Sequence, residues 1–342
     1  MPIKEDLAKG GKFISDLSER ELLTREKIRV IINEFSQGQK LDCEKTKALK
    51  HPVYATIPKS DSPHYHKVFK RIARQIGEVR LGVALGSGGS YGFAHIGVLE
   101  VLEENNIDID IICGSSMGSL VAAMWAAGFS VDKMKQVAAN FGKKLNLFSF
   151  PGFYFPFKGI IKAKRSEKIY KEIFGGLTFH DLKHDLKLAS FDFYKRKAAV
   201  LDEGLLYKAV AASCAIPGVF EPVKMKKNLM LDGGVLNPLP SKILLNYGVN
   251  KIIAINVTPP LEKVALRQKI KGKWHIFDFI FGTIETMQRE FIDAALKVSD
   301  VVIHPVFEAT DWAHFENVDE YIEAGRKAAL GKLNDIKELS ER

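Results

Sequence analysis

Residues 79–127 read VRLGVALGSGGSYGFAHIGVLEVLEENNIDIDIICGSSMGSLVAAMWAA. An apolar strand, a glycine-rich turn and a helix follow one another twice in this stretch. The apolar runs at 79–85 and 109–113 have the length of strands, and a helical pattern follows each turn. Strands that alternate with helices favour a sheet with helices on both faces, so the stretch predicts an α/β fold.

The same alternation continues towards the C-terminus. Helices are expected at 93–102, 120–127, 205–213 and 240–247 and from about residue 319, and strands at 186–193, 197–201, 251–257 and 301–303. We therefore divide the chain into three parts. They are an N-terminal extension (1–78), an α/β domain (79–257) and a helical C-terminal region (258–342) that packs on this domain.

The N-terminal extension is expected to be helical. Apolar side chains at positions 28, 31, 32 and 35 have the spacing of one helix face, and this helix should end near Gly38. Three prolines make residues 51–64 a predicted loop. A short basic helix is expected over 64–76.

The charge of the chain is concentrated in two regions. Its 342 residues carry a formal net charge of +9 at pH 7. Residues 1–80 hold 17 basic and 11 acidic side chains, and residues 143–165 hold 6 basic and no acidic ones. Each region is thus +6, which leaves −3 for the remainder. A charge localised in this way argues against a general polyanion binder, and we expect no nucleic-acid partner.

Composition narrows the class of protein further. Apolar residues make up 46% and charged residues 27% of the chain, as in globular proteins. The N-terminus lacks the apolar segment of a signal peptide, and no run approaches the roughly 18 apolar residues of a membrane-spanning helix. Cys43, Cys113 and Cys214 form neither a zinc motif nor a disulfide framework. We expect a cytoplasmic protein with no metal site and no cofactor.

The strongest chemical motif is Gly-Ser-Ser-Met-Gly at 114–118, between a predicted strand and a predicted helix. In a nucleophile elbow, small residues such as Gly114 and Gly118 permit the tight turn that lifts a serine hydroxyl clear of the sheet. The following helix N-terminus would stabilise developing negative charge. The motif predicts a nucleophilic Ser116, and the alternative is a helix start capped by Ser115 or Ser116.

A second glycine-rich turn, GSGGSYG at 86–92, also lies between a strand and a helix. Its backbone N–H groups could hold a phosphate or form an oxyanion hole. Gly86, Gly88 and Gly92, with Asp108 further on, approximate a dinucleotide-binding pattern. A dinucleotide site explains only this turn. A nucleophile turn and an oxyanion turn at one sheet edge explain both turns.

A third motif, Asp232-Gly233-Gly234, follows apolar residues and by itself favours an ordinary turn. Together the three motifs resemble the patatin-like phospholipase family. The resemblance rests on ALGSGGSYGFAHIGVLEVL (84–102), GSSMG (114–118), AASCAIPGVFEPV (211–223) and DGGVLNPLP (232–240), with a weaker echo in IEAGRKAA (322–329). It implies a three-layer patatin-like sheet with helices on both faces.

The resemblance also implies a serine acyl hydrolase with a Ser-Asp dyad. In it, Ser116 is the nucleophile, Asp232 is its base, and the N–H groups of Gly88 and Gly89 form the oxyanion hole. Burial between the two loops would raise the pKa of Asp232 and make it a stronger base.

Two positions depart from the family's loop, which usually reads Gly-Gly-Gly-x-Arg-Gly or has lysine for the arginine. Ser87 replaces the first glycine of the triplet and Tyr91 replaces the basic residue. A serine still supplies a backbone N–H, but both changes keep a second class of function open. That alternative is a catalytically altered module for lipid binding or regulation.

A Ser-His-Asp esterase is the competing enzyme. Its order along the chain would make His304, after the strand at 301–303, the catalytic histidine. His95 falls within the helix predicted at 93–102, where a packed or surface residue is expected. Only one predicted strand precedes 109–113, whereas that fold places several before its elbow, and this favours the dyad.

Two aromatic segments suit a membrane surface. Residues 147–157 hold 6 aromatic side chains in 11 positions, among them Phe153, Tyr154 and Phe155, between flanking basic residues. A second segment contains Trp274 and Phe277 and follows four basic residues. Such segments insert at anionic lipid interfaces, although a pocket roof or a core position is the alternative for both. We expect a phospholipase A or lysophospholipase that is peripheral at a membrane and acts on phospholipid or lysophospholipid.

Overall fold

The computed structural model describes residues 30–33, 53–57, 73–74, 76–145, 161–260, 276–307, 315 and 317–341. The chain divides into two compact units, Met1–Glu78 and Val79–Arg342. The candidate chemistry lies in the second unit.

In the first unit, strands β1 (Val30–Asn33) and β2 (Val53–Ile57) pair in parallel. The sequence predicted a helix over the first segment and a loop over the second, so both predictions are wrong at these residues. Val30, Ile31 and Ile32 are consecutive β-branched residues, which fit a strand better than a helix. Most of the helix predicted over 64–76 lies outside the described residues.

The second unit is built around one sheet. Among the described residues, its strands run in the order β10-β9-β3-β4-β5-β8-β7, with β6 also paired to β5. The strands are β3 (Leu81–Leu85), β4 (Ile111–Gly114), β5 (Asp185–Asp192), β6 (Lys197–Leu201), β7 (Val223–Met225), β8 (Asn228–Asp232), β9 (Lys251–Ile255) and β10 (Val301–Ile303). The pairs from β10 to β5 are parallel, whereas β6 and β8 pair antiparallel with β5, and β7 does so with β8.

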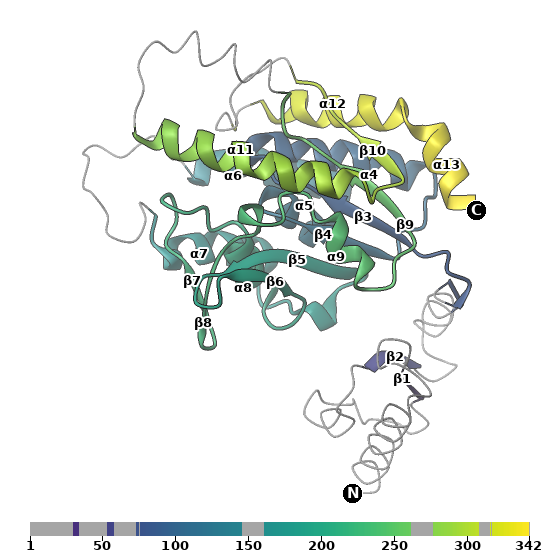
Figure 1. Cartoon of the computed structure of the whole chain (residues 1–342), viewed down its shortest axis with the longest axis horizontal. Coiled ribbons are helices and arrows are strands. Elements are labelled where there is room, and N and C mark those ends of the chain that lie inside the picture. The colour runs from purple at the N-terminus through teal and green to yellow at the C-terminus, as the bar shows by residue number, and fades with distance from the viewer. Residues whose placement is uncertain are drawn as a thin grey trace, which may run out of the picture. The chain divides into compact units, whose positions relative to one another are not determined.

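Helices cover both faces of this sheet (Figure 1). One face carries α4 (Ala94–Glu104), α5 (Met117–Ala126), α6 (Val131–Leu145), α7 (Ala163–Phe174), α8 (Leu206–Ser213), α12 (Val318–Leu330) and α13 (Leu333–Glu341). The other carries α9 (Ser241–Leu245) and α11 (Ile276–Leu296). Short 3-10 turns lie at Gly89–Phe93, Phe179–Asp181 and Gly233–Val235. No helix in the described part of the chain is long and apolar enough to cross a membrane.

The buried strands separate two apolar cores. Val83 and Leu85 belong to one core and Ala84 to the other, because successive strand side chains point to opposite faces. Both faces of the parallel strands are therefore buried, as is usual for parallel sheets. The predicted three-layer α/β architecture is confirmed.

Two glycines let α4 and α12 cross in close contact, side by side in Figure 1. A Cβ added at Gly97 would overlap the backbone oxygen of Ile322, and one at Gly325 would overlap that of Ala94. The crossing is therefore backbone against backbone. It fastens the C-terminal region to the helix that follows the first glycine-rich loop.

Candidate active site

Ser116 lies at the turn between β4 and α5. β4 ends at Gly114, α5 begins at Met117, and Ser116 has φ 52° and ψ −122°. A positive φ at a residue with a side chain costs on the order of 1–3 kcal/mol and persists only where the surroundings enforce it. The strand, turn and helix predicted around Gly-Ser-Ser-Met-Gly are thus present, with the strain located at Ser116.

Gly114 and Gly118 allow this turn because the backbone passes close to both. A Cβ at Gly114 would lie 2.6 Å from Ser119 Cα, and one at Gly118 would lie 2.6 Å from the carbonyl oxygen of Gly86. The second approach brings the serine turn against the glycine-rich loop at 86–92. The structure therefore places the two turns side by side.

Asp232 reaches Ser116 through the register of three strands. Gly114 of β4 lies opposite Leu188 of β5, and Ser190 lies opposite Asp232 at the end of β8. Ser116 comes two residues after Gly114, just as Ser190 comes two residues after Leu188. The register therefore brings Ser116 and Asp232 to the same level on either side of β5.

A direct hydrogen bond joins the two side chains. Ser116 Oγ donates to Asp232 Oδ2 at 2.7 Å, and the backbone N–H of Gly234 donates to Oδ1, also at 2.7 Å. Ser116 is 7% exposed and Asp232 is 5% exposed. Asp232 also caps the turn at Gly233–Val235, so the turn expected from Asp-Gly-Gly and the contact with Ser116 occur together.

Burial changes the acidity of this carboxyl group. Burial raises the pKa of Asp232 to about 7, although the hydrogen bonds from Ser116 and Gly234 act in the opposite direction. A carboxylate with this pKa holds a proton far more readily than one in water. The pair can therefore transfer the Ser116 proton near neutral pH.

The glycine-rich loop presents backbone N–H groups beside this pair. The N–H of Gly86 donates to the Ile255 carbonyl at 3.0 Å, and that of Ser87 donates to the Pro238 carbonyl at 2.7 Å. Within the described residues, no carbonyl accepts from Gly88 or Gly89. These two N–H groups are available to an oxyanion.

The two departures from the family loop have different surroundings. Tyr91 is 2% exposed, stacks on Phe307 with ring centroids 4.8 Å apart and meets Tyr321 edge-on at 5.5 Å. It therefore packs the loop against α12. Ser87 is 8% exposed, and its hydroxyl would lie 3.3 Å from a Cβ at Gly234.

Neither candidate histidine contacts Ser116 or Asp232 through a described hydrogen bond. His95 is buried, its Nε2 bonds to the Gly86 carbonyl at 2.8 Å, and burial lowers its pKa to about 4. The neutral ring therefore donates this bond and supports the loop. His304 follows β10, which β9 and β3 separate from β4, so it lies on the order of 14 Å away at the usual strand spacing. It is not placed to act as a base for Ser116.

The residues expected at a membrane are mostly outside the described part. Phe153, Tyr154, Phe155 and Trp274 lie outside it, and Phe277 falls on α11 with a side chain that is not described. Helix α11 does reach the site, because Gln288 Nε2 donates to the Gly234 carbonyl at 2.9 Å. Sequence reasoning missed this contact, and no motif in α11 signals it. In the described residues, no cluster of three or more His, Cys, Asp or Glu side chains could hold a metal ion.

The end of α8 also contacts the serine turn. Ser213 and Cys214 both bond to the backbone of Ser116. Sequence reasoning assigned them no role, although both lie in the AASCAIPGVFEPV stretch that carries the family resemblance.

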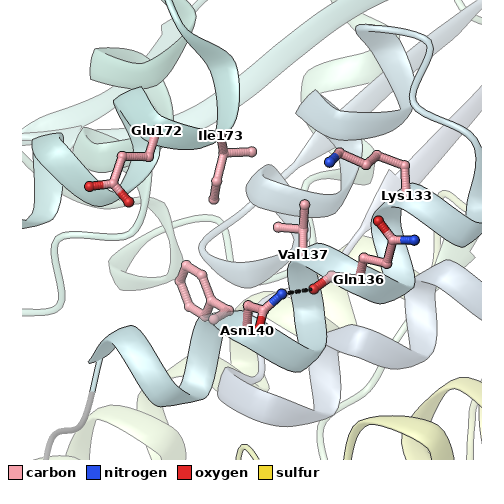
Figure 2. Close-up of a pocket in the computed structure, with 7 residues that line it drawn as sticks. Lys133, Gln136, Val137, Asn140, Glu172 and Ile173 are labelled. Atoms are coloured by element: carbon pink, nitrogen blue, oxygen red, sulfur yellow. Dashed lines mark hydrogen bonds between the residues drawn. The ribbon is translucent and has the colours of Figure 1, made fainter.

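A separate pocket of about 210 Å³ lies between α6 and α7 (Figure 2). It is lined by Lys133, Gln136, Val137, Asn140, Phe141, Glu172 and Ile173. Ile173 and Val137 come from facing helices (Figure 2), and the ring centroid of Phe141 lies 5.9 Å from that of Tyr170. Ser116 and Asp232 do not line this pocket.

Comparison with known proteins shows which family the region around this site resembles. Residues 83–245 match the family model for patatin-like phospholipases. An uncharacterized NTE family protein of Mycobacterium tuberculosis is 34% identical over 52% of this chain and 49% of its own length. The Drosophila melanogaster protein named neuropathy target esterase sws is 29% identical over 60% of this chain and 15% of its own. The chain thus matches half or less of each of these relatives.

Among solved structures, VipD from Legionella pneumophila is 14% identical with a TM-score of 0.44, over 75% of this chain and 67% of that one. This score is too low to carry weight. The family match does not depend on it and runs from β3 to α9, with Ser116 and Asp232 inside it. Over residues 83–245, just under half of the chain, the sequence is similar to the patatin-like phospholipase family.

Proposed function

We propose that this chain is a serine acyl hydrolase that cleaves carboxylic esters of phospholipids or lysophospholipids. The observation that carries the proposal is the 2.7 Å hydrogen bond from Ser116 Oγ to Asp232 Oδ2 at a strained turn. The match of residues 83–245 to the family model for patatin-like phospholipases supports the substrate class. So does the name of a Candida albicans relative, lysophospholipase NTE1, which is 27% identical over 61% of this chain.

The first half of the reaction forms an acyl-enzyme. Ser116 Oγ attacks the ester carbonyl carbon while its proton moves to Asp232 Oδ2, and the carbonyl electron pair moves onto oxygen. The N–H groups of Gly88 and Gly89 stabilise that oxyanion. The intermediate then collapses, the bond to the leaving alcohol breaks, and the alcohol takes the proton from Asp232.

The second half releases the acyl chain. A water molecule attacks the Ser116 ester while Asp232 accepts its proton, and the fatty acid leaves as Ser116 regains a proton. Every atom that reacts in these two steps belongs to the protein chain, to the ester or to water.

Three terms lower the barrier. The rise in the pKa of Asp232 from 3.8 to about 7 makes proton transfer from Ser116 less unfavourable by about 4 kcal/mol, at about 1.4 kcal/mol per pKa unit. Each oxyanion donor is worth about 3–4 kcal/mol in hydrolases of this kind. The N-terminus of α5, which begins at Met117, adds a favourable dipole beside the developing charge.

We test the assignment by replacing serines in the same turn. Ser116→Ala should abolish both fluorophosphonate labelling and lipid hydrolysis. Ser115→Ala is the matched control, because Ser115 Oγ is buried and has no hydrogen-bond partner among the described residues. A labelled Ser116→Ala protein would exclude Ser116 as the nucleophile.

The role of Asp232 has its own test. Asp232→Asn should fold and lose ester hydrolysis, because an amide cannot accept the serine proton. Assay on a panel of phospholipids and lysophospholipids identifies the substrate. Hydrolysis retained by Asp232→Asn would exclude the dyad.

The membrane part of the proposal rests on the aromatic and basic segments and on α11. Phe279 and Met287 of α11 are each 59% exposed, and Met287 precedes the residue that bonds to Gly234. We propose that Phe153, Tyr154, Phe155, Trp274 and Phe277 join this helix in contacting an anionic membrane from the cytoplasmic side. Each basic residue near such a surface contributes about 1 kcal/mol.

A vesicle experiment tests this contact. Replacement of Phe153, Tyr154 and Phe155 by serine should reduce cosedimentation with anionic vesicles and leave hydrolysis of a short, soluble ester unchanged. Vesicle binding equal to that of the wild type would exclude an interfacial role for these three residues.

A further inference from the structure

We infer that Ser213 and Cys214, at the C-terminal end of α8, are positioning residues that hold the backbone of Ser116 in its reactive conformation. The inference rests on the proposed role of Ser116 as the nucleophile. α8 ends at Ser213, and Cys214 is its C-cap. The two residues bond to the two polar groups of one backbone unit, the N–H and the C=O of Ser116.

Ser213 holds the N–H group. Ser116 N–H donates to Ser213 Oγ at 3.3 Å, Ser213 Oγ donates to the Ala189 carbonyl at 2.5 Å, and Ser119 Oγ lies 2.5 Å from Ser213 Oγ. A hydroxyl has one proton and two lone pairs. Because the carbonyl can only accept, the Ser213 proton goes to Ala189 and Ser119 must donate. All the hydrogen-bonding capacity of this buried hydroxyl is then used.

Cys214 holds the carbonyl group. Its Sγ donates to the Ser116 oxygen at 3.0 Å, and the residue is 7% exposed. Burial raises the pKa of the Cys214 thiol far above neutrality, so the thiol keeps the proton that it donates. Burial, with a smaller contribution from Cys214, raises the pKa of the Tyr170 hydroxyl on α7.

These contacts explain how a strained residue is kept in place. Ser116 has φ 52°, which is strained for a residue with a side chain, and such a conformation relaxes unless the surrounding structure holds it. Ser213 ties the Ser116 N–H to β5 through Ala189, and Cys214 ties the Ser116 carbonyl to the C-terminal end of α8. The hydroxyl of Ser116 is then directed at Asp232 by elements on both sides of it.

The serine test compares two buried hydroxyls of the same network. Ser213→Ala removes the only described acceptor of the Ser116 N–H, whereas Ser119→Ala, the matched control, removes a hydroxyl that bonds only to Ser213. We expect Ser213→Ala to lower kcat and the rate of fluorophosphonate labelling roughly tenfold with KM unchanged, as the loss of one net hydrogen bond predicts. Ser119→Ala should keep both rates within about twofold of the wild type.

The cysteine test uses rescue. Cys214→Ala should lower kcat roughly fivefold, and Cys214→Ser, which restores a donor, should recover most of this loss. Thermal unfolding of each variant reports the structural cost separately. A wild-type kcat in Ser213→Ala or Cys214→Ala would overturn the inference. So would equal losses in Ser119→Ala and Ser213→Ala.

Amide hydrogen exchange at Ser116 separates failure of this inference from failure of the proposed function. If the wild type neither hydrolyses lipids nor reacts with the fluorophosphonate, the proposed function fails. The rate of amide hydrogen exchange at Ser116 then tests the positioning role by itself. Faster exchange at Ser116 in Ser213→Ala than in Ser119→Ala supports the role. Equal protection in the two variants overturns it.

Discussion

Replacement of Asp232 by asparagine should change how stability depends on pH. The Asp232 carboxyl is 5% exposed, and burial raises its pKa from 3.8 to about 7. The folded chain therefore holds this proton more tightly than the unfolded chain. The resulting stabilisation is fully present below about pH 3.8 and is lost as the pH rises through about 7.

The magnitude follows from the pKa shift. At about 1.4 kcal/mol per pKa unit, the stability lost between pH 3 and pH 8 is about 4 kcal/mol. About 3 kcal/mol of this falls between pH 5 and pH 8, because the unfolded carboxyl is already mostly ionised at pH 5. Asparagine does not titrate, and its amide can accept from Gly234 while donating to Ser116. Relative to the wild type, Asp232→Asn should therefore gain about 3 kcal/mol between pH 5 and pH 8.

Urea unfolding at pH 5 and pH 8, followed by circular dichroism, measures this difference. In thermal unfolding, this difference in stability corresponds to a change in Tm of about 5 °C or more for a unit of this size. Asp335→Asn is the control, because Asp335 is 55% exposed and should leave the curve parallel to that of the wild type. Parallel curves for Asp232→Asn and the wild type would refute a raised pKa for Asp232.

Three further outcomes are expected. The kcat for a soluble ester should rise with pH through an apparent pKa near 7, because only ionised Asp232 accepts the proton; a flat profile from pH 5 to pH 9 would contradict this. His304→Ala should keep ester hydrolysis within a fewfold of the wild type, and its complete loss would point to a Ser-His-Asp triad. Gly325→Ala should destabilise the fold by about 3 kcal/mol or more in urea unfolding, because its Cβ would overlap the Ala94 backbone oxygen. Gly176→Ala is its control, since a Cβ at Gly176 meets nothing within 4 Å. Equal free energies of unfolding for Gly325→Ala and Gly176→Ala would show that α12 can shift away from α4 without cost.

Local pattern predicts much of the second unit. The strands expected at 197–201 and 301–303 have those bounds in the structure, and those expected at 109–113 and 251–257 are shifted or shortened by about two residues. Short apolar runs beside glycine or proline specify these elements without reference to distant residues.

Elements that depend on distant partners were not predictable in this way. Val30–Asn33 lies within a stretch whose apolar residues at 28, 31, 32 and 35 have helical spacing, yet it is a strand that pairs with Val53–Ile57. Helices α6 and α7 were not predicted for a different reason. Their buried residues, Met134, Ala138 and Phe141 in α6 and Ile169, Tyr170 and Phe174 in α7, have the spacing of one helix face, a local signal that sequence reasoning missed.

The candidate site divides in the same way. The sequence by itself determined that Ser116 sits in a tight strand-to-helix turn, because Gly114 and Gly118 are the residues that let the backbone pass so closely. Asp-Gly-Gly by itself favoured an ordinary turn, only the family resemblance implied Asp232 as the base, and His304 stayed open as the alternative base. Only the tertiary structure shows which of the two lies beside Ser116. The pairing of β4, β5 and β8 brings Asp232 within 2.7 Å of Ser116, burial brings its pKa near neutrality, and two strands separate His304 from β4. Strand register and burial are properties of the packed chain, and no local stretch of sequence contains them.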